Sequence, residues 1–250
     1  MKKLGLMGAM PEEMELIVAS MKLHCTTVHG NRSYYEGEIQ GIPVVAVFSR
    51  WGKVAAASTA TTLIEHFGVE ELLFTGVAGG IAPELSVGDV VISRQLYQHD
   101  MDARPLMARY EVPLTGRTGF ETDSAMCHRL EKAVVSMLEQ QKDFLNDLAA
   151  TGIQSPKVVK GDVASGDQFI AGTSVKESIR EGLPSVLCVE MEGAAVGQVC
   201  CDFGIPLALV RVISDTADEL SHELAIRFVD RYAARYLQLI VHHYIHENHT

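Results

Sequence analysis

Residues 189–195, with the sequence VEMEGAA, constrain the fold of this chain more than any other segment. The apolar run 186–189 leads into this segment and predicts the end of a buried strand. The small residues that follow predict a closely packed helix over 193–203. Glu190 and Glu192 therefore stand where a buried strand ends. Desolvating a carboxylate there is costly, so a function usually explains its presence.

Apolar segments of strand and helix type alternate along the rest of the chain. Strands are expected at 4–7, 72–75, 90–93, 157–163 and 207–213, with a hairpin over 34–48. Helices are expected at 11–21, 53–66, 124–145, 174–180 and 224–245. Residues 76–80 predict a glycine-rich turn, and residues 97–122 predict an irregular functional or interface segment. The alternation predicts an α/β fold: a single three-layer α/β/α domain over 1–250 around a central mixed, twisted sheet.

Charge and cysteine usage exclude several classes of partner. The formal net charge of -11 argues against binding nucleic acid and against a polybasic membrane contact. Acidic residues interrupt the apolar start of the chain too early for a signal peptide, and no stretch is long enough to span a bilayer. The 5 cysteines have no metal or redox spacing and predict free, at least half-buried thiols in a reducing cytosol, so a cytoplasmic protein. A tail of histidines, comprising His242, His243, His246 and His249, predicts a solvated helix end rather than a metal site.

Polar and aromatic residues follow most of the predicted strand ends, and the ends of neighbouring strands meet at one rim of such a sheet. The rim residues are Met10, Glu12, Glu13, Arg50, Trp51, Asp167, Phe169, Ile170, Glu190, Met191, Glu192, Arg211, Ser214 and Asp215. The set holds no serine or cysteine nucleophile with a histidine partner and no metal ligands at metal spacing. It suits cleavage of a glycosidic bond, because carboxylates stabilise an oxocarbenium-like transition state and activate water. A further acid can protonate a leaving nucleobase, and an aromatic ring can stack on it.

Six motifs occur in order along the chain: GAMPEE (8–13), GKVAAA (52–57), TGVAGG (75–80), SGDQFI (165–170), VEMEGAA (189–195) and ISD (213–215). On these motifs the chain resembles the 5'-methylthioadenosine/S-adenosylhomocysteine nucleosidases of the nucleoside phosphorylase superfamily, from about residue 2 to residue 245. The resemblance implies hydrolysis of the N-glycosidic bond of either nucleoside, with release of adenine. It also implies a small-molecule adenine nucleoside as the substrate, no cofactor or metal, and a homodimer.

The resemblance assigns a role to most of the rim residues. Glu13 matches the base that activates water, and Asp215 matches the acid that protonates adenine. Glu192 matches the carboxylate that binds the ribose hydroxyls. The remaining binding positions are Met191 at the ribose, Arg211 near the water, Phe169 and Ile170 at the base, Met10 and Trp51 at the 5' substituent, Ser214 as a supporting hydrogen bonder, and the Val77, Ala78 and Gly79 backbone.

Three positions depart from the family pattern. Val77 stands where many relatives have serine, Trp51 where a smaller aliphatic residue is common, and Gly193 where alanine is often found. The acids of residues 11–13 would repel phosphate, which predicts water as the nucleophile.

Structural alternatives remain open for the acids. Glu13 could be a first-turn helix acid, Asp215 could cap a turn, and Glu190 or Glu192 could form a structural ion pair with Arg211. A structural role is favoured for Glu190. Two other functions also remain: a nucleosidase for another 5'-modified adenine nucleoside such as 6-amino-6-deoxyfutalosine, and a non-catalytic nucleoside-binding protein.

Overall fold

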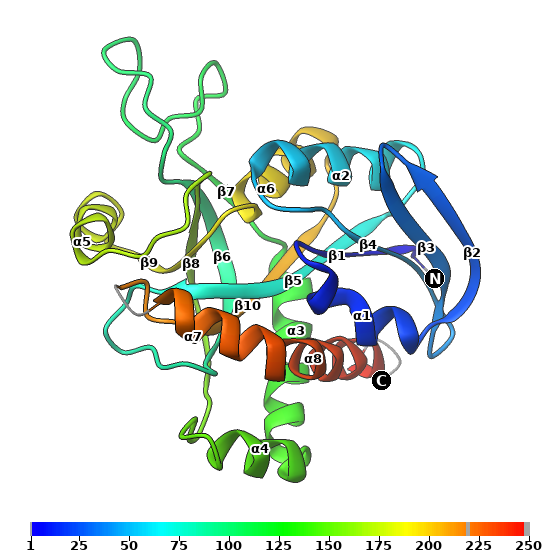
Figure 1. The fold of residues 1–250 in the computed structure, drawn as a ribbon. Helices are drawn as coiled ribbons and strands as arrows, with labels where there is room; N and C mark the ends of the chain where they lie inside the picture. The colour runs from blue at the N-terminus through cyan, green and yellow to red at the C-terminus, as the bar shows by residue number, and fades with distance from the viewer. Residues whose placement is uncertain (1, 219–220, 248–250) are drawn as a thin grey trace.

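A mixed β-sheet lies between two helical layers in the computed structural model, which describes residues 2–218 and 221–247 (Figure 1). One layer holds α1 (Pro11–Ala19), α3 (Ser124–Gln140) and α8 (Ala234–Glu247), and these helices pack on one another. The other layer holds α2 (Lys53–Glu65) and α6 (Gly193–Phe203). A separate hydrophobic core fills each side of the sheet. The predicted three-layer α/β architecture is confirmed.

The strands of the described residues follow the order β10-β6-β8-β9-β5-β1-β4-β3-β2, with β7 on β6. Their bounds are β1 (Leu4–Gly8), β2 (Lys22–His29), β3 (Arg32–Ile39), β4 (Ile42–Phe48), β5 (Glu71–Gly80), β6 (Val90–Gln98), β7 (Gly119–Glu121), β8 (Val158–Ser165), β9 (Val186–Glu190) and β10 (Leu207–Asp215). Strand β10 also pairs in parallel with β5, so the strands from β5 to β10 close into a ring. Every residue of β10 is buried, as its nearly continuous apolar sequence suggests.

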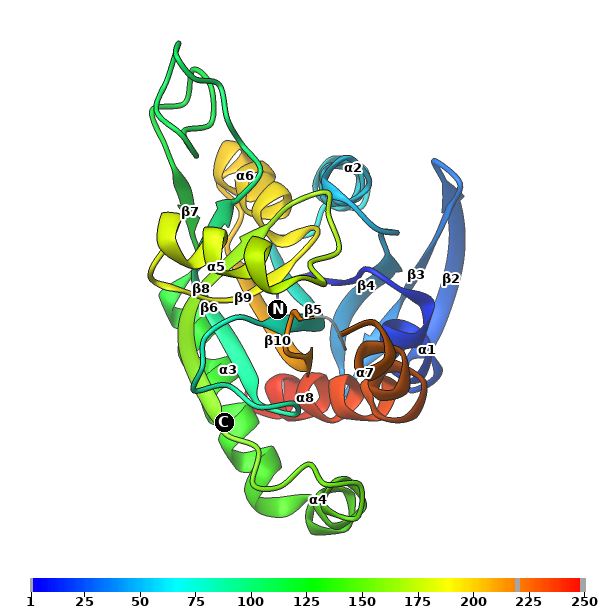
Figure 2. The ribbon, with the colours of Figure 1, turned by 60° about the vertical axis from the view of Figure 1, so that its left-hand side comes forward.

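Two short helices lie outside the main layers, and the C-terminal helix has an irregular start. Helix α4 (Lys142–Ala149) extends from the end of α3, and α5 (Thr173–Gly182) lies beside β8 and β9 (Figure 2). Helix α7 (Ser221–Phe228) continues through a π-helical segment (Val229–Ala233) into α8. The segment between β6 and β7 rises away from the body of the molecule in both views (Figures 1 and 2). No helix in the described ranges 2–218 and 221–247 is long and apolar enough to cross a membrane.

The structure corrects three of the expected elements and contains β2, which was not expected. Residues 76–80 continue β5 instead of forming a turn, because they keep pairing with β10 and β9. The helix expected over 124–145 breaks at Gln141, whose ψ of 56° is not helical. The single helix expected over 224–245 is divided by the π-helical segment. Strand β2 was not predicted, because almost all its residues are exposed and it lacks an apolar alternation.

Candidate active site

The glycine-rich end of β5 forms the centre of the candidate site. Parallel pairing with β10 sets Gly76 opposite Arg211 and Gly79 opposite Asp215. A Cβ atom on Gly76 would lie 2.9 Å from Glu13 Oε1, and one on Gly79 would lie 2.9 Å from Asp215 Oδ1. Both carboxyls therefore pack against bare backbone, which explains why glycine stands at these two positions.

Glu13 is the third residue of α1 and is 1% exposed. Its Oε2 accepts hydrogen bonds from the amides of Ala9 (2.6 Å) and Met10 (3.1 Å), and its Oε1 accepts one from the amide of Val77 (3.0 Å). The bond from Met10 is the glutamate half of a capping box, so the helix-acid interpretation describes part of its role. Burial raises the pKa of Glu13, and the Arg211 guanidinium and the three amides oppose that rise.

Glu190 and Arg211 form a buried ion pair, with 2.7 Å between Glu190 Oε2 and Arg211 Nη2. Arg211 also donates to the carbonyls of Phe74 and Val210 and lies over the Phe74 ring. Glu190 accepts further bonds from the Ser165 hydroxyl and from the amides of Glu192 and Gly193. The Glu190 carboxylate is thus saturated with internal partners, which favours the structural role expected for it. A Cβ atom on Gly193 would lie 2.5 Å from Leu209 Cδ1 and 3.1 Å from Glu190 Oε1, so a larger residue here would require both side chains to shift.

Glu192 has a different environment from Glu190, although only one residue separates them. Its Oε1 accepts a bond of 2.7 Å from the amide of Gly52, which precedes α2. Burial and the neighbouring Glu190 charge raise the pKa of Glu192 to about 8, despite the Gly52 amide and Arg211. No hydrogen bond from Arg211 to Glu192 occurs among the described residues, so the ion pair considered for both acids forms with Glu190 alone.

Asp215 ends β10 on the other side of the glycine segment and is buried. Its Oδ1 accepts from the Ala217 amide (2.9 Å) and its Oδ2 from the Ser214 hydroxyl (2.8 Å). The Ser214 hydroxyl also lies 3.3 Å from the Ala78 carbonyl. These bonds fix the orientation of the carboxyl, and the Ala217 bond is the turn cap that the sequence alternative described.

Phe169 and Ile170 follow β8 and differ in burial. The Ile170 side chain is buried in a small core with Val189 and Ala217, the residue that binds Asp215. The Phe169 side chain is 53% exposed at the surface. Met191, between the two glutamates, is half-buried. The structure therefore places Ile170 beside the Asp215 turn and leaves much of Phe169 accessible.

A hydrogen-bonded network that the sequence did not suggest holds the segment before Phe169. Lys53 Nζ lies 2.6 Å from Asp100 Oδ1, and the Lys53 amide donates to Asp167 Oδ1 (2.8 Å). The Asp167 amide in turn donates to Asp100 Oδ2 (3.0 Å). Burial raises the pKa of Asp100, but the hydrogen bonds from Lys53 and Asp167 outweigh it and lower that pKa overall. Lys53 belongs to the motif GKVAAA (52–57), but its contact with Asp100 joins segments far apart in the sequence and is formed only in the folded chain.

A groove of about 380 Å³ opens beside the start of α1. Its walls include Met10 and Trp51, the residues expected at the 5' substituent, together with Glu12 and Arg50. Trp51 is 67% exposed, so the groove is open on that side. Met10 connects the groove to Glu13 through its amide.

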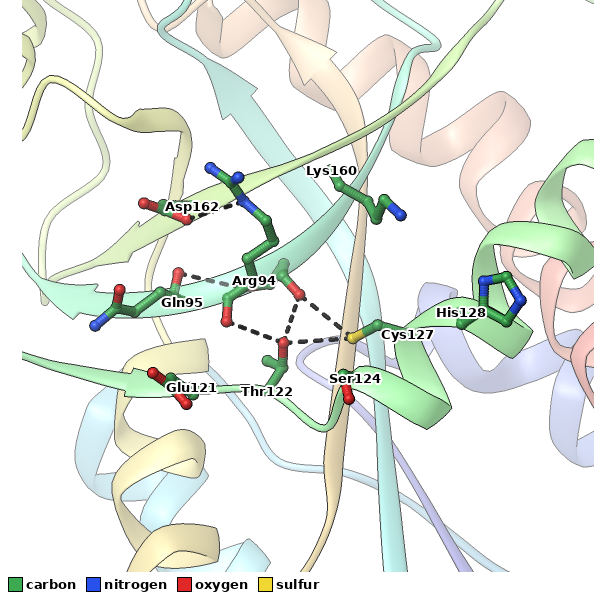
Figure 3. Close-up of a pocket in the computed structure, with 10 residues that line it drawn as sticks. Arg94, Gln95, Glu121, Thr122, Ser124, Cys127, His128, Lys160 and Asp162 are labelled. Carbon is green, nitrogen blue, oxygen red and sulfur yellow. Dashed lines mark hydrogen bonds and ion pairs between the residues drawn. The ribbon is translucent and has the colours of Figure 1, made fainter.

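A larger cavity of about 570 Å³ lies between β6, β7, β8 and α3 and contains none of the expected site residues (Figure 3). Two of its cations are paired with acids: Arg94 lies 3.5 Å from Asp162, and Lys160 lies 2.8 Å from Glu131. Burial raises the pKa of the Cys127 thiol at its wall. Size alone would favour this cavity, but the buried carboxyls Glu13 and Asp215 lie at the β5 glycine segment and not here.

The cysteines and the histidine tail are placed partly as expected. All five cysteines are free, but Cys25 and Cys201 are exposed rather than half-buried. Helix α8 stays regular through His246, with His242 Nε2 2.8 Å from Ser20 Oγ, so this end packs more closely than expected; His249 lies outside the described residues. No group of three or more possible metal ligands occurs within 2–218 and 221–247.

The chain is similar to known proteins over nearly its full length. A family profile described as the Phosphorylase superfamily matches residues 3–246. The nucleosidase for 5'-methylthioadenosine and S-adenosylhomocysteine from Neisseria meningitidis, in complex with methylthio-immucillin-A, is 30% identical, with a TM-score of 0.85 and coverage of 98% of this chain and 99% of that chain. The corresponding Colwellia psychrerythraea 34H nucleosidase, in complex with adenine, is 28% identical, with a TM-score of 0.87 and coverage of 98% and 95%.

A futalosine hydrolase of Helicobacter pylori strain 26695 is also similar. It is 28% identical, with a TM-score of 0.84 and coverage of 98% of each chain. The relatives thus include nucleosidases named for different 5'-modified nucleosides. The chain belongs to the Phosphorylase superfamily and, within it, to the family of 5'-methylthioadenosine/S-adenosylhomocysteine nucleosidases.

Proposed function

We propose that this enzyme hydrolyses the N-glycosidic bond of 5'-methylthioadenosine and S-adenosylhomocysteine, releasing adenine and the 5'-substituted ribose. The observation that carries the proposal is the pair of buried carboxyls, Glu13 and Asp215, packed against opposite ends of the same glycine segment. Each is oriented by hydrogen bonds from fixed groups. Two oriented carboxyls suit a reaction that needs one acid and one base.

In the proposed mechanism the bond between the ribose and adenine breaks first, and its electron pair leaves with adenine. Asp215 gives a proton to a ring nitrogen of the departing base. Glu192 holds the ribose hydroxyls, and the surrounding carboxylates stabilise the positive charge that develops on the sugar. Glu13 takes a proton from the water that adds to the sugar. Its raised pKa makes the ionised form a stronger base than an ordinary glutamate.

The remaining contacts are proposed from the resemblance of the sequence motifs to those of the 5'-methylthioadenosine/S-adenosylhomocysteine nucleosidases. Phe169 stacks on adenine, Ile170 presents its backbone to the edge of the base, and Met191 lines the ribose. Met10 and Trp51 contact the 5' group, and Arg211 acts near the water while it neutralises Glu190. The backbone of Val77–Gly79 faces the sugar, and Ser214 supports Asp215.

Water, rather than phosphate, is the proposed nucleophile. Arg211, the cation that lies near Glu13 and Glu192, is engaged by Glu190, and Lys53, which follows Gly52, is engaged by Asp100. A phosphate would also meet Glu13, whose ionised form the proposed mechanism uses, so electrostatic repulsion disfavours it.

Adenine release from methylthioadenosine, measured with and without phosphate, tests the proposal. We expect adenine and free methylthioribose in phosphate-free buffer, and at least about 100-fold slower release by a matched Asp215→Asn preparation, which controls for contaminating nucleosidases. Release that depends on phosphate would overturn the hydrolytic mechanism. The same assay with 6-amino-6-deoxyfutalosine tests the second candidate, which the similarity to a futalosine hydrolase favours.

We also propose that residues 1–250 form one domain and that the protein is a cytoplasmic homodimer acting in methionine salvage. The projecting segment between β6 and β7 exposes Leu106 (88%) and Leu114 (93%), and α2 exposes Val54 (82%). Burial of these apolar side chains by a second copy would remove them from water. Light scattering at several protein concentrations tests the dimer, and a monomer mass throughout would contradict it.

A further inference from the structure

The groove beside α1 carries two unlike charges in addition to its apolar wall. Met10, Phe48 and Trp51 supply apolar surface, and Arg50 and Glu12 supply a guanidinium and a carboxylate. No ion pair joins either of them to another side chain of the described residues. An open groove with one group of each sign, both unpaired, is complementary to a zwitterion.

Arg50 is held in an uncommon conformation at this groove. Its φ of 73° is left-handed, which is costly for a residue with a side chain. The backbone around it is fixed by bonds from the Ser49 amide to the Gly8 carbonyl (2.8 Å) and from Arg32 Nε to the Ser49 carbonyl (3.0 Å). Arg50 Nη2 donates to the Asn31 carbonyl at 2.6 Å. These contacts fix the position of the Arg50 guanidinium and leave other N–H donors of that group available to a ligand.

Glu12 and Glu13 are neighbours on the first turn of α1 but have opposite surroundings. Glu13 is buried and bonded to three amides, whereas Glu12 is exposed and lines the groove. The first turn of α1 therefore places the Glu13 carboxylate at the proposed reaction centre and the Glu12 carboxylate at the groove that Met10 lines.

We propose that Arg50 and Glu12 form a subsite for an α-amino acid group attached through sulfur to the 5' carbon of the nucleoside. Arg50 binds the α-carboxylate and Glu12 binds the α-ammonium, while the apolar wall contacts the thioether and its methylene groups. This inference rests on the proposed function, because it needs the 5' end of the nucleoside to lie in the groove. S-adenosylhomocysteine carries this group and methylthioadenosine does not, so the subsite favours the former.

The ratio of kcat/KM for S-adenosylhomocysteine to that for methylthioadenosine tests the subsite. We expect Arg50→Gln and Glu12→Gln each to lower this ratio about threefold to fivefold, the upper part of the range for an exposed charge pair, with methylthioadenosine hydrolysis changed less than twofold. Arg50→Lys should retain most of the ratio because it keeps the charge. The wild-type ratio should fall as salt is raised, since salt screens exposed charges. Glu15→Gln, an exposed acid on the same helix outside the groove, is the matched control.

Equal losses for both substrates, an unchanged ratio in both variants, or the same change in Glu15→Gln would overturn the subsite. Ligand binding, measured without catalysis, distinguishes failure of the subsite from failure of the proposed function. The chain has 1 tryptophan, Trp51, which lines the groove, so its fluorescence reports occupancy without catalysis. If the wild type releases no adenine from either nucleoside, the proposed function fails. Selective weakening of S-adenosylhomocysteine binding in Arg50→Gln would still support the subsite, and equal or absent binding of the two nucleosides would overturn it.

Discussion

Replacing Glu192 with glutamine should change how the stability of the protein depends on pH. Burial and the Glu190 charge raise the pKa of Glu192 to about 8 from an ordinary 4.5. The folded protein therefore retains a proton between these pH values that the unfolded chain releases. A carboxyl with a raised folded pKa contributes stability below the unfolded pKa, and this contribution is lost as pH rises through the folded pKa. The wild type should thus lose stability relative to Glu192→Gln from about pH 4.5 to about pH 8.

The size of this effect follows from the pKa difference. At about 1.36 kcal/mol per pKa unit, the full loss has an upper limit of about 5 kcal/mol. Water entering the open site and adjustment of the Glu190–Arg211 pair relieve part of the cost, so we expect about 2 kcal/mol between pH 5 and pH 8. The side-chain oxygen of the introduced glutamine can still accept from the Gly52 amide, which keeps the comparison close to isosteric.

Urea unfolding of both ligand-free proteins at pH 5, 6.5 and 8 measures the effect. One protein concentration should be used throughout, because dimer formation would add a concentration-dependent term. Glu121→Gln, an exposed position on β7, is the control and should track the wild type at every pH. A stability difference between wild type and Glu192→Gln that stays constant with pH, or that favours the wild type as pH rises, would refute the reasoning.

Four further substitutions test the site. Glu13→Gln should slow hydrolysis by about 10²- to 10⁴-fold; because the pKa of Glu13 is raised, the acidic fall in wild-type kcat/KM should occur above pH 4.5 and should be absent from the pH profile of the variant. Asp215→Asn should lose at least about 100-fold in kcat with an unchanged circular dichroism spectrum, since asparagine can still accept from the Ala217 amide but has no acidic proton to give. Gly79→Ala should lower kcat/KM by at least about tenfold because its Cβ atom would lie 2.9 Å from Asp215 Oδ1, whereas Gly172→Ala, with nothing within 4 Å, should retain activity. Asp100→Asn should raise KM about tenfold and speed hydrogen exchange at the Lys53 and Asp167 amides, because both amides belong to the Asp100 network. Unchanged hydrogen exchange at these amides would show that loss of the network does not cause the change in KM.

The sequence alone determined the layer architecture and the candidate residues. Apolar runs of strand length alternating with helical patterns specify an α/β sheet, and most elements appear within a few residues of their expected bounds. Short motifs identified Glu13, Glu192 and Asp215 because each follows a strand end or begins a helix, where local sequence decides position. Local pattern also indicated that Arg211 stands on a buried strand.

Only the tertiary structure decided how these residues are paired. The roles of Glu190 and Glu192 separate because one reaches Arg211 on β10 and the other reaches the Gly52 amide before α2, contacts between segments far apart in the chain. Strand β2 and the Asp100 network depend on partners that no local pattern specifies. Residues 76–80 resembled a turn because glycines often mark turns, but pairing with β10 and β9 keeps them extended, and their missing side chains admit two carboxyls. Periodicity therefore fixed which residues are buried, and the long-range register of the closed strands fixed what each buried charge contacts.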